Sequence, residues 1–251
     1  MSLRTIWGLL AALILAGCPP RPGPTTVPIP TADLPGAPGG RCLVVFLPGL
    51  GDHKEDFFHK GGFLKAFRDS GSPCEVIAVE SHFGYFADGS IVERLHQDVI
   101  APARARGVEK IWLVGISLGG LGASLYACDR PGEVEGLVLL SPYLGDDPIL
   151  DEIEKAGGPR KWHPAAPPEP RDLRRLWVWF QGFETPGAER PPLLLGFGDS
   201  DRLRRGHRLL ASLLPPDRVL HTHGGHTWFA WRRLWRQVLA TGAFEGRGAI
   251  R

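Results

Sequence analysis

A short apolar run that ends in a glycine-flanked serine constrains the fold of this chain more than any other feature. Residues 111–114 read Ile-Trp-Leu-Val, residues 115–119 read Gly-Ile-Ser-Leu-Gly, and small residues follow at 120–125. This order predicts a buried strand, a sharp turn at Ser117 and a helix. A side chain at either flanking glycine would collide with a neighbouring strand or helix, so we expect Ser117 to be strained and exposed as a nucleophile. An ordinary tight turn or a phosphate-cradling loop is the alternative interpretation.

Apolar runs alternate with stretches of helical periodicity along most of the chain. The runs predict strands at residues 42–47, 75–80, 111–116, 134–141, 193–197 and 219–222. Helices are expected at about residues 55–70, 91–106, 119–129, 204–214 and 227–241. This alternation is typical of an α/β fold, in which helices cover both faces of a mostly parallel sheet. With 251 residues, 43% of them hydrophobic, one such domain fits the chain, and we place it at residues 41–251.

Residues 144–192 interrupt the alternation of strands and helices, because no strand is predicted within them. A helical insertion of this length before the penultimate strand is usually a lid or an elaborated loop. Its second half contains Trp177, Trp179 and Phe180. These aromatic side chains either line an acyl pocket or pack in the core.

The N-terminus carries a targeting signal. Arg4 precedes an apolar run at residues 6–15, which is too short to span a bilayer of about 30 Å and predicts a secretory signal over residues 1–17. Residues 15–18 read Leu-Ala-Gly-Cys and resemble a bacterial lipobox, so we expect cleavage before Cys18 and its lipid modification. An ordinary cleaved signal with an incidental cysteine is the alternative.

The proline-rich residues 18–40 predict a semi-extended spacer between this anchor and the domain. Together, the signal and Cys18 predict a protein that is lipid-anchored to the membrane outside the cytoplasm, on the periplasmic side or at the outer membrane. In that oxidising compartment, Cys42 and Cys74 are able to form a disulfide if the strands that they open are neighbours. Cys128 is expected to be a small buried residue of a helix.

Charge composition excludes one class of partner. The chain has 29 Lys and Arg against 27 Asp and Glu, a net charge of +2, and no basic stripe with interleaved aromatic residues. We therefore expect no nucleic-acid partner.

A base and an acid follow the serine along the chain. A serine hydroxyl needs a general base within hydrogen-bond reach, and that base needs an orienting group. His226, which follows two glycines after the last predicted strand, is the candidate base. After the penultimate strand two aspartates compete, and the spacing Gly-x-x-Asp fits both Asp199 and Asp201. We favour Asp201, because Asp-Arg before an apolar residue and a helix is the commoner exit from this turn.

An acyl-transfer intermediate also needs two N–H donors for its oxyanion. Leu118, at the start of the helix after the serine, is expected to supply one. Leu50, in the glycine-rich turn after the first predicted strand, is expected to supply the other. This turn lacks the Gly-Lys-Ser/Thr ending of a phosphate loop.

Taken together, these residues resemble the α/β-hydrolase superfamily from about residue 41 to the end of the chain. The order Ser, Asp, His is the one found in that superfamily. Residues 224–228 read Gly-Gly-His-Thr-Trp, similar to the ending of small bacterial esterases and of the esterase D and mycolyl-transferase branch. The chain lacks an obvious first antiparallel hairpin, so a sheet with a shortened N-terminal edge is expected.

The resemblance implies a serine hydrolase that cleaves a carboxylic ester or related acyl bond of a small-molecule or lipid-like substrate without a cofactor. An acyltransferase, a thioesterase and a non-catalytic envelope lipoprotein are the alternatives. His82, Tyr85 and Tyr143 are candidates for the substrate pocket, although a lone histidine such as His82 is more often structural. The histidines at 221, 223 and 226 lack partner ligands at zinc-site spacing, so no metal site is expected.

Overall fold

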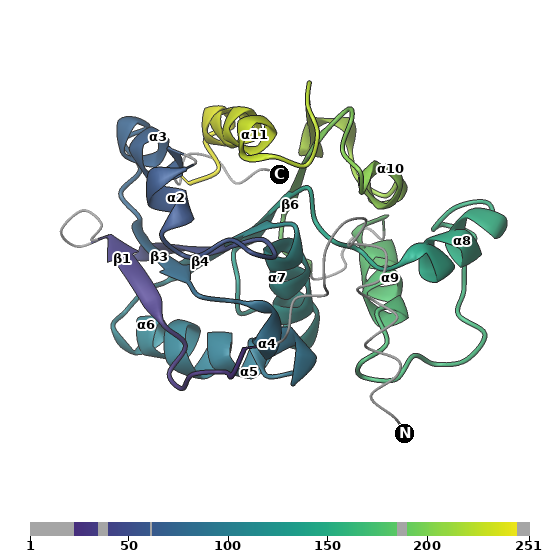
Figure 1. Cartoon of the computed structure of the whole chain (residues 1–251), viewed down its shortest axis with the longest axis horizontal. Helices are drawn as coiled ribbons and strands as arrows, with labels where there is room; N and C mark the ends of the chain where they lie inside the picture. Colours follow the sequence, from purple (N-terminus) through teal and green to yellow (C-terminus); the bar gives the residue numbers. More distant parts are fainter. Residues whose placement is uncertain (1–22, 35–39, 61, 185–189, 245–251) are drawn as a thin grey trace.

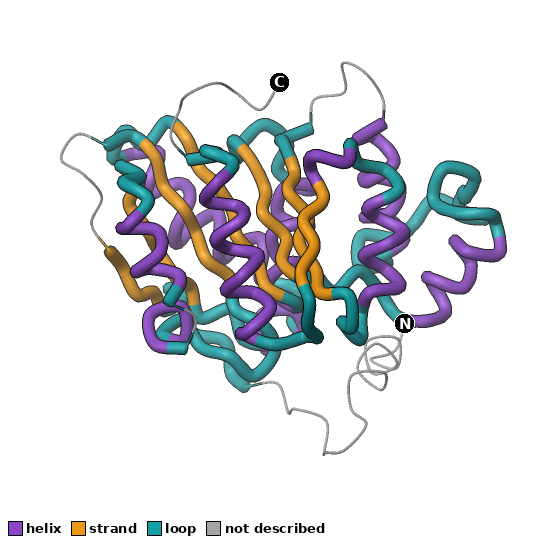
Figure 2. Tube along the Cα trace, turned by 90° about the horizontal axis from the view of Figure 1, so that it is seen from above, coloured by secondary structure: helices purple, strands orange, loops and turns teal. Residues whose placement is uncertain are grey.

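A seven-stranded sheet forms the centre of the molecule, with helices on both of its faces (Figures 1 and 2). The computed structural model describes residues 23–34, 40–60, 62–184 and 190–244. The strands are β1 (Thr31–Leu34), β2 (Cys42–Leu47), β3 (Glu75–Val79), β4 (Lys110–Ile116), β5 (Gly136–Leu140), β6 (Leu193–Gly198) and β7 (Val219–Thr222). Their order across the sheet is β1-β3-β2-β4-β5-β6-β7, and every neighbouring pair is parallel except β1 with β3. The predicted α/β fold with a mostly parallel sheet is confirmed.

Two layers of helices cover the sheet. One layer, packed on Val44 and Phe46 of β2, comprises α2 (Asp56–His59), α3 (Phe63–Asp69) and α11 (Trp228–Ala240). The other comprises α4 (Phe83–Ala87), α5 (Ile91–Leu95), α6 (Ala101–Ala105), α7 (Leu118–Asp129), α8 (Asp147–Lys155), α9 (Arg174–Gln181) and α10 (Arg204–Ala211). The short turns are η2 (His96–Ile100), η3 (Gly182–Glu184) and η4 (Pro216–Arg218). Because both faces are covered, alternate residues of the central strands are buried on opposite sides, which explains their continuous apolar runs.

The N-terminal edge of the sheet contains one strand that the sequence did not predict. Residues Thr31–Leu34 fall in the segment interpreted as a spacer, yet they form β1 and pair antiparallel with β3, with Thr31 opposite Val79. Ile29, just before β1, is buried in the core. The spacer prediction is therefore wrong for this segment. Four residues between prolines are too short for a periodicity signal, and an edge strand needs hydrogen bonds on one side only.

Two of the predicted helices have a more complex form. The helix expected at 55–70 is divided into α2 and α3, because Gly62 adopts a left-handed backbone conformation with φ of +58°. The helix expected at 91–106 contains the π-helical turn η2 before α6. Pro102 lies in the first turn of α6, and a proline lacks the N–H that a regular helix needs at that point.

The insertion at residues 144–192 adds α8 and α9 at one end of the molecule (Figure 1). Trp177, Trp179 and Phe180 are all buried in the core below the sheet. The indole N–H of Trp177 donates to the Leu144 carbonyl over 2.8 Å. The aromatic side chains of α9 therefore pack in the core, the second of the two interpretations. Whether the insertion acts as a lid stays a prediction.

Two of the three cysteines of the domain form a disulfide, and the third is a free thiol. Cys42 of β2 and Cys74, directly before β3, form a disulfide, as adjacent strands allow. Cys128 lies in α7 and is half-buried. Within the described part of the chain, no helix has the length and apolar character needed to cross a membrane. The predicted signal at 1–17 and Cys18 lie outside the described residues.

Candidate active site

The backbone at Ser117 has the strained geometry that the sequence predicts for a sharp turn, but the expectation of an exposed serine is wrong, because Ser117 is buried with 3% of its surface exposed. Its φ is +51° and its ψ is −113°, in a region that residues other than glycine rarely adopt. The Ser117 N–H donates to the Leu140 carbonyl at 3.0 Å, which fixes the turn to β5. A conformation of this kind costs about 1–3 kcal/mol and persists only where surrounding structure enforces it.

The two flanking glycines allow this turn to pack. A Cβ atom on Gly115 would lie 2.3 Å from the Gly119 carbonyl oxygen of α7. A Cβ atom on Gly119 would lie 2.1 Å from the Leu47 carbonyl oxygen at the end of β2. Both distances are far below van der Waals contact with backbone atoms that have no room to move. The sequence interpretation of these glycines is confirmed.

The parallel sheet brings three polar side chains to its carboxyl edge. Ser117 follows β4, Asp201 lies three residues after β6, and His226 lies four residues after β7. The loops after β6 and β7 touch, since a Cβ atom on Gly198 would lie 2.1 Å from the Gly224 carbonyl oxygen. His226 Nε2 is 2.8 Å from Ser117 Oγ, and His226 Nδ1 is 3.1 Å from both carboxylate oxygens of Asp201. One imidazole therefore links the serine hydroxyl to a carboxylate.

Asp201 is fully buried and nevertheless ionised. Burial alone would raise its pKa, but the hydrogen bond and charge of His226 and the nearby Ser141 hydroxyl lower the pKa of Asp201 to about 2. The Leu203 N–H also donates to Oδ1 over 2.8 Å. A carboxylate held in this way stabilises positive charge on the imidazole.

The rival aspartate belongs to a second, exposed pair. Asp199 binds His223 Nδ1 at 2.7 Å and accepts the Gly224 N–H at 3.1 Å. The side chains of Asp199 and His223 are 51% and 91% exposed. Hydrogen bonds from Gly224 and His223 lower the pKa of Asp199 to about 2. Asp199 thus braces the loop that carries His226, whereas Asp201 contacts His226 itself.

Two backbone N–H groups adjoin the serine. Leu118 begins α7, where the helix dipole favours negative charge. Leu50 follows Gly49, and a Cβ atom on Gly49 would lie 3.4 Å from Ser117 Cβ, so this turn packs against the serine. Neither N–H has a hydrogen-bond acceptor among the described residues. Their role as the two donors to an oxyanion at Ser117 stays a prediction.

Most of the chain, including the three linked side chains, matches a known protein family. Residues 44–246 match the model of the "Alpha/beta hydrolase family". The chain belongs to this family. The match begins within β2 and ends after α11, so it includes the serine, the aspartate and the histidine. Comparison with curated proteins yields no significant match.

Solved structures with the same fold resemble this alpha/beta hydrolase at low sequence identity. A monoacylglycerol lipase of Paleococcus ferrophilus has a TM-score of 0.56 and 18% identity, covering 85% of this chain and 98% of its own. An S-formylglutathione hydrolase of Staphylococcus aureus has a TM-score of 0.55 and 16% identity, with 83% and 82% covered. Est1E from Butyrivibrio proteoclasticus, with ferulic acid bound, has a TM-score of 0.56 and 15% identity, with 86% and 94% covered.

The candidate pocket residues separate into two groups. Tyr143 adjoins the serine, because its N–H donates to the Ser117 carbonyl at 2.9 Å; its side chain is buried, which raises its pKa. His82 instead caps α4 by accepting the Gly84 N–H at 3.0 Å. Tyr85 is fully buried, and its hydroxyl donates to the Thr26 carbonyl at 2.9 Å. His82 and Tyr85 thus hold the N-terminal segment against α4, and no described contact joins them to Ser117 or His226.

Two buried polar residues near Asp201 were not predicted from the sequence. Ser141 follows β5 with φ of +48° and is fully buried. His207 of α10 is also fully buried, lies near Asp201, and forms a 2.9 Å hydrogen bond from Nε2 to the Pro142 carbonyl. Burial lowers the pKa of His207 to about 4, so the ring is neutral at pH 7. No sequence signal marked His207, because it lies among the arginines at the start of α10.

Proposed function

We propose that this protein is a serine hydrolase that cleaves a carboxylic ester or related acyl bond through an acyl-enzyme intermediate. The observation that carries the proposal is the continuous hydrogen-bonded chain from Ser117 Oγ through His226 to the buried carboxylate of Asp201. Structural side chains rarely combine a strained serine with a histidine and a buried acid at these distances, whereas acyl transfer requires all three.

The chemistry follows from the geometry. His226 Nε2 takes the proton of Ser117 Oγ as the oxygen attacks the substrate carbonyl. The negative charge that develops on the carbonyl oxygen is stabilised by the N–H groups of Leu118 and Leu50. The imidazolium then donates its proton to the leaving alcohol. Water, deprotonated by His226, attacks the acyl-serine, and the proton returns to Ser117 as the acid departs. Throughout, Asp201 orients the imidazole and stabilises its positive charge.

Covalent labelling tests this proposal directly. A fluorophosphonate probe should label the purified protein, and Ser117→Ala should abolish the labelling. Ser124→Ala is the matched control, because Ser124 lies on the same helix, α7, and its hydroxyl donates to the Gly120 carbonyl of that helix. Labelling that persists in Ser117→Ala, or a wild-type protein that is never labelled, would count against the serine mechanism and favour a non-catalytic binding protein.

A panel of small esters and thioesters tests the substrate class. The similar structures are named for a glutathione thioester, a monoacylglycerol and ferulic acid chemistry, so a panel of S-acyl glutathione, monoacylglycerol and feruloyl esters covers thioester, lipid and aryl substrates. Product analysis with added alcohol acceptors distinguishes hydrolysis from acyl transfer, because the transferase would form a new ester in place of the free acid.

We also propose that Cys18 anchors the protein to a membrane outside the cytoplasm. The lipobox-like residues 15–18 and the apolar run before them support this placement. Cys18→Ala should leave the precursor unprocessed and release the protein from the membrane fraction. Unchanged processing and fractionation of Cys18→Ala would exclude the tether.

A further inference from the structure

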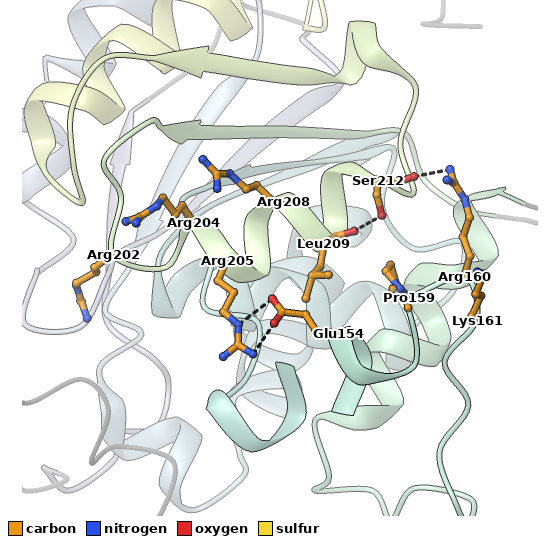
Figure 3. Close-up of a pocket in the computed structure, with 12 residues that line it drawn as sticks. Glu154, Pro159, Arg160, Lys161, Arg202, Arg204, Arg205, Arg208, Leu209 and Ser212 are labelled. Carbon is orange, nitrogen blue, oxygen red and sulfur yellow. Dashed lines mark hydrogen bonds and ion pairs between the residues drawn. The ribbon is translucent and has the colours of Figure 1, made fainter. Parts of the chain in front are cut away.

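A basic groove lies between the insertion and α10, apart from the serine. It encloses about 810 Å³, and its lining comes from the end of α8, the loop that follows it, and the turn and helix after Asp201 (Figure 3). The lining contains six cationic side chains: Arg160, Lys161, Arg202, Arg204, Arg205 and Arg208. Glu154 is the one acidic side chain among them. Acyl pockets are mostly apolar, so a groove with this lining fits a charged ligand.

Two of the cations are already neutralised. Arg205 pairs with Glu154 at 2.8 Å, with Asp147 at 3.2 Å and with Asp151. Arg160 pairs with Glu184, and its guanidinium also donates to the Ser212 carbonyl. These contacts connect α10 to α8 and the loop after α8 to the end of α10, so they have a structural role.

Four cations lack such compensation. Within the described part of the chain, no carboxylate lies within ion-pair distance of Lys161, Arg202, Arg204 or Arg208. Arg204 makes only a 3.3 Å hydrogen bond to the Asp201 carbonyl oxygen. Figure 3 shows the guanidinium groups of Arg204 and Arg208 extending on the same side of α10, with Arg202 on the turn that precedes the helix.

This arrangement is electrostatically unfavourable without a ligand. Arg204 and Arg208 are four residues apart on one helix, a spacing at which like charges repel. Arg204 also begins α10, where the backbone dipole favours anions over cations, whereas Arg208 lies in the last turn of the helix. The whole chain has a net charge of only +2, so four uncompensated cations in one groove are a local concentration. An anion placed there would offset the repulsion between the two arginines and the unfavourable dipole at Arg204.

We propose that this groove binds a phosphate-bearing ligand. Arginine forks bind phosphate through paired N–H···O bonds, and the groove is large enough for a group bigger than one phosphate. The same chemistry is offered by a soluble phosphorylated compound and by the headgroup of an anionic phospholipid. The proposal does not depend on Ser117, because the groove residues lie outside the hydrogen-bonded chain from the serine to Asp201.

The experiment measures binding of inorganic pyrophosphate to the purified full chain by calorimetry, and co-sedimentation with phosphatidylglycerol vesicles against phosphatidylcholine vesicles. Lys161→Gln with Arg208→Gln removes two exposed, unpaired cations from different parts of the groove. The matched control is Arg232→Gln with Arg236→Gln, which removes two exposed arginines of α11 outside the groove. Thermal unfolding establishes that both variants are folded.

We expect binding that weakens at least tenfold in the groove variant and less than threefold in the control. Pyrophosphate binding identifies a soluble ligand as sufficient, and binding to anionic vesicles alone identifies a lipid headgroup; either result supports the site if it depends on Lys161 and Arg208. Absence of binding to both probes, or an equal loss in the two variants, would overturn the proposal. Labelling of Ser117 is independent of all these outcomes, so failure here leaves the proposed hydrolase intact.

Discussion

Asp199 and Asp201 fit the same sequence spacing but have different environments, so exchanging each for asparagine tests the site most sharply. Asp201→Asn replaces a buried carboxylate whose two oxygens lie 3.1 Å from His226 Nδ1. Asp199→Asn makes the same chemical change two residues away, at a side chain that is half exposed and contacts His223. Each variant therefore serves as the control for the other.

The expected magnitude follows from the charge on the imidazole. A carboxylate about 4 Å from an imidazolium stabilises it by about 4 kcal/mol at an effective dielectric constant of about 20. Since about 1.4 kcal/mol of barrier corresponds to a tenfold rate change, the loss of this charge alone lowers kcat about 10³-fold. Asparagine also favours the wrong imidazole tautomer, which brings the expected loss for Asp201→Asn to about 10³–10⁴-fold. Asp199→Asn keeps an oxygen that accepts the Gly224 N–H and should lose less than about tenfold.

The assay is the steady-state hydrolysis of an activated ester such as p-nitrophenyl acetate, with fluorophosphonate labelling rates as a second readout. Both variants are first compared in thermal unfolding, so that a misfolded protein is recognised. If Asp199→Asn loses as much activity as Asp201→Asn, or if Asp201→Asn stays within tenfold of the wild type, the assignment of Asp201 as the partner of His226 is refuted.

Three further predictions concern stability. Gly119→Ala should lower both the melting temperature and the labelling rate, because its Cβ atom would lie 2.1 Å from a backbone oxygen. The control is Gly206→Ala, whose Cβ atom would have no contact closer than 3.5 Å, and it should be neutral or stabilising by up to about 1 kcal/mol in urea unfolding. The pKa of His207 is about 4 in the folded protein, against 6.5 for a free histidine, so the unfolded state binds a proton first as the pH falls. Up to about 3 kcal/mol of the free energy of unfolding should therefore be lost between pH 6.5 and 4. In urea titrations, His207→Gln should reduce this dependence of the unfolding free energy on pH. Replacing both Cys42 and Cys74, which are 32 residues apart, with serine should lower the free energy of unfolding by about 3–4 kcal/mol, because the disulfide restricts the unfolded chain. An unchanged melting temperature in this double variant would contradict a stabilising role for the disulfide.

The central sheet and the chain from serine to acid could be predicted because each depends on a local pattern. Buried parallel strands leave continuous apolar runs, and parallel topology places the residues after β4, β6 and β7 at one edge. The choice between Asp199 and Asp201 required coordinates, because both satisfy the same spacing and differ only in burial. In the structure, one aspartate turns inward under His226 and the other turns outward to His223.

What sequence reasoning missed depends on contacts between distant segments. His207 reaches the region of Asp201 only because α10 packs beneath β6, and no local pattern reports that packing. Similarly, Tyr85 appeared to be placed for a substrate pocket after β3, but the N-terminal segment folds back and occupies its hydroxyl through Thr26. The expected spacer conceals these contacts, since the residues that bind Tyr85 lie inside it.

The short strand β1 protects an edge of the sheet, and the prolines that precede it contribute to this protection. A strand at the edge of a sheet exposes unpaired N–H and C=O groups that invite another chain to pair and aggregate. Without β1, that exposed edge would be β3, whose Val, Ile and Ala residues form an apolar template. With β1 in place, Pro30 immediately precedes the edge strand and Pro28 lies two residues before Pro30, and neither proline has an N–H to offer. A recombinant protein begun at Arg41 would remove this cap and should self-associate, whereas one begun at Gly23 keeps the edge closed.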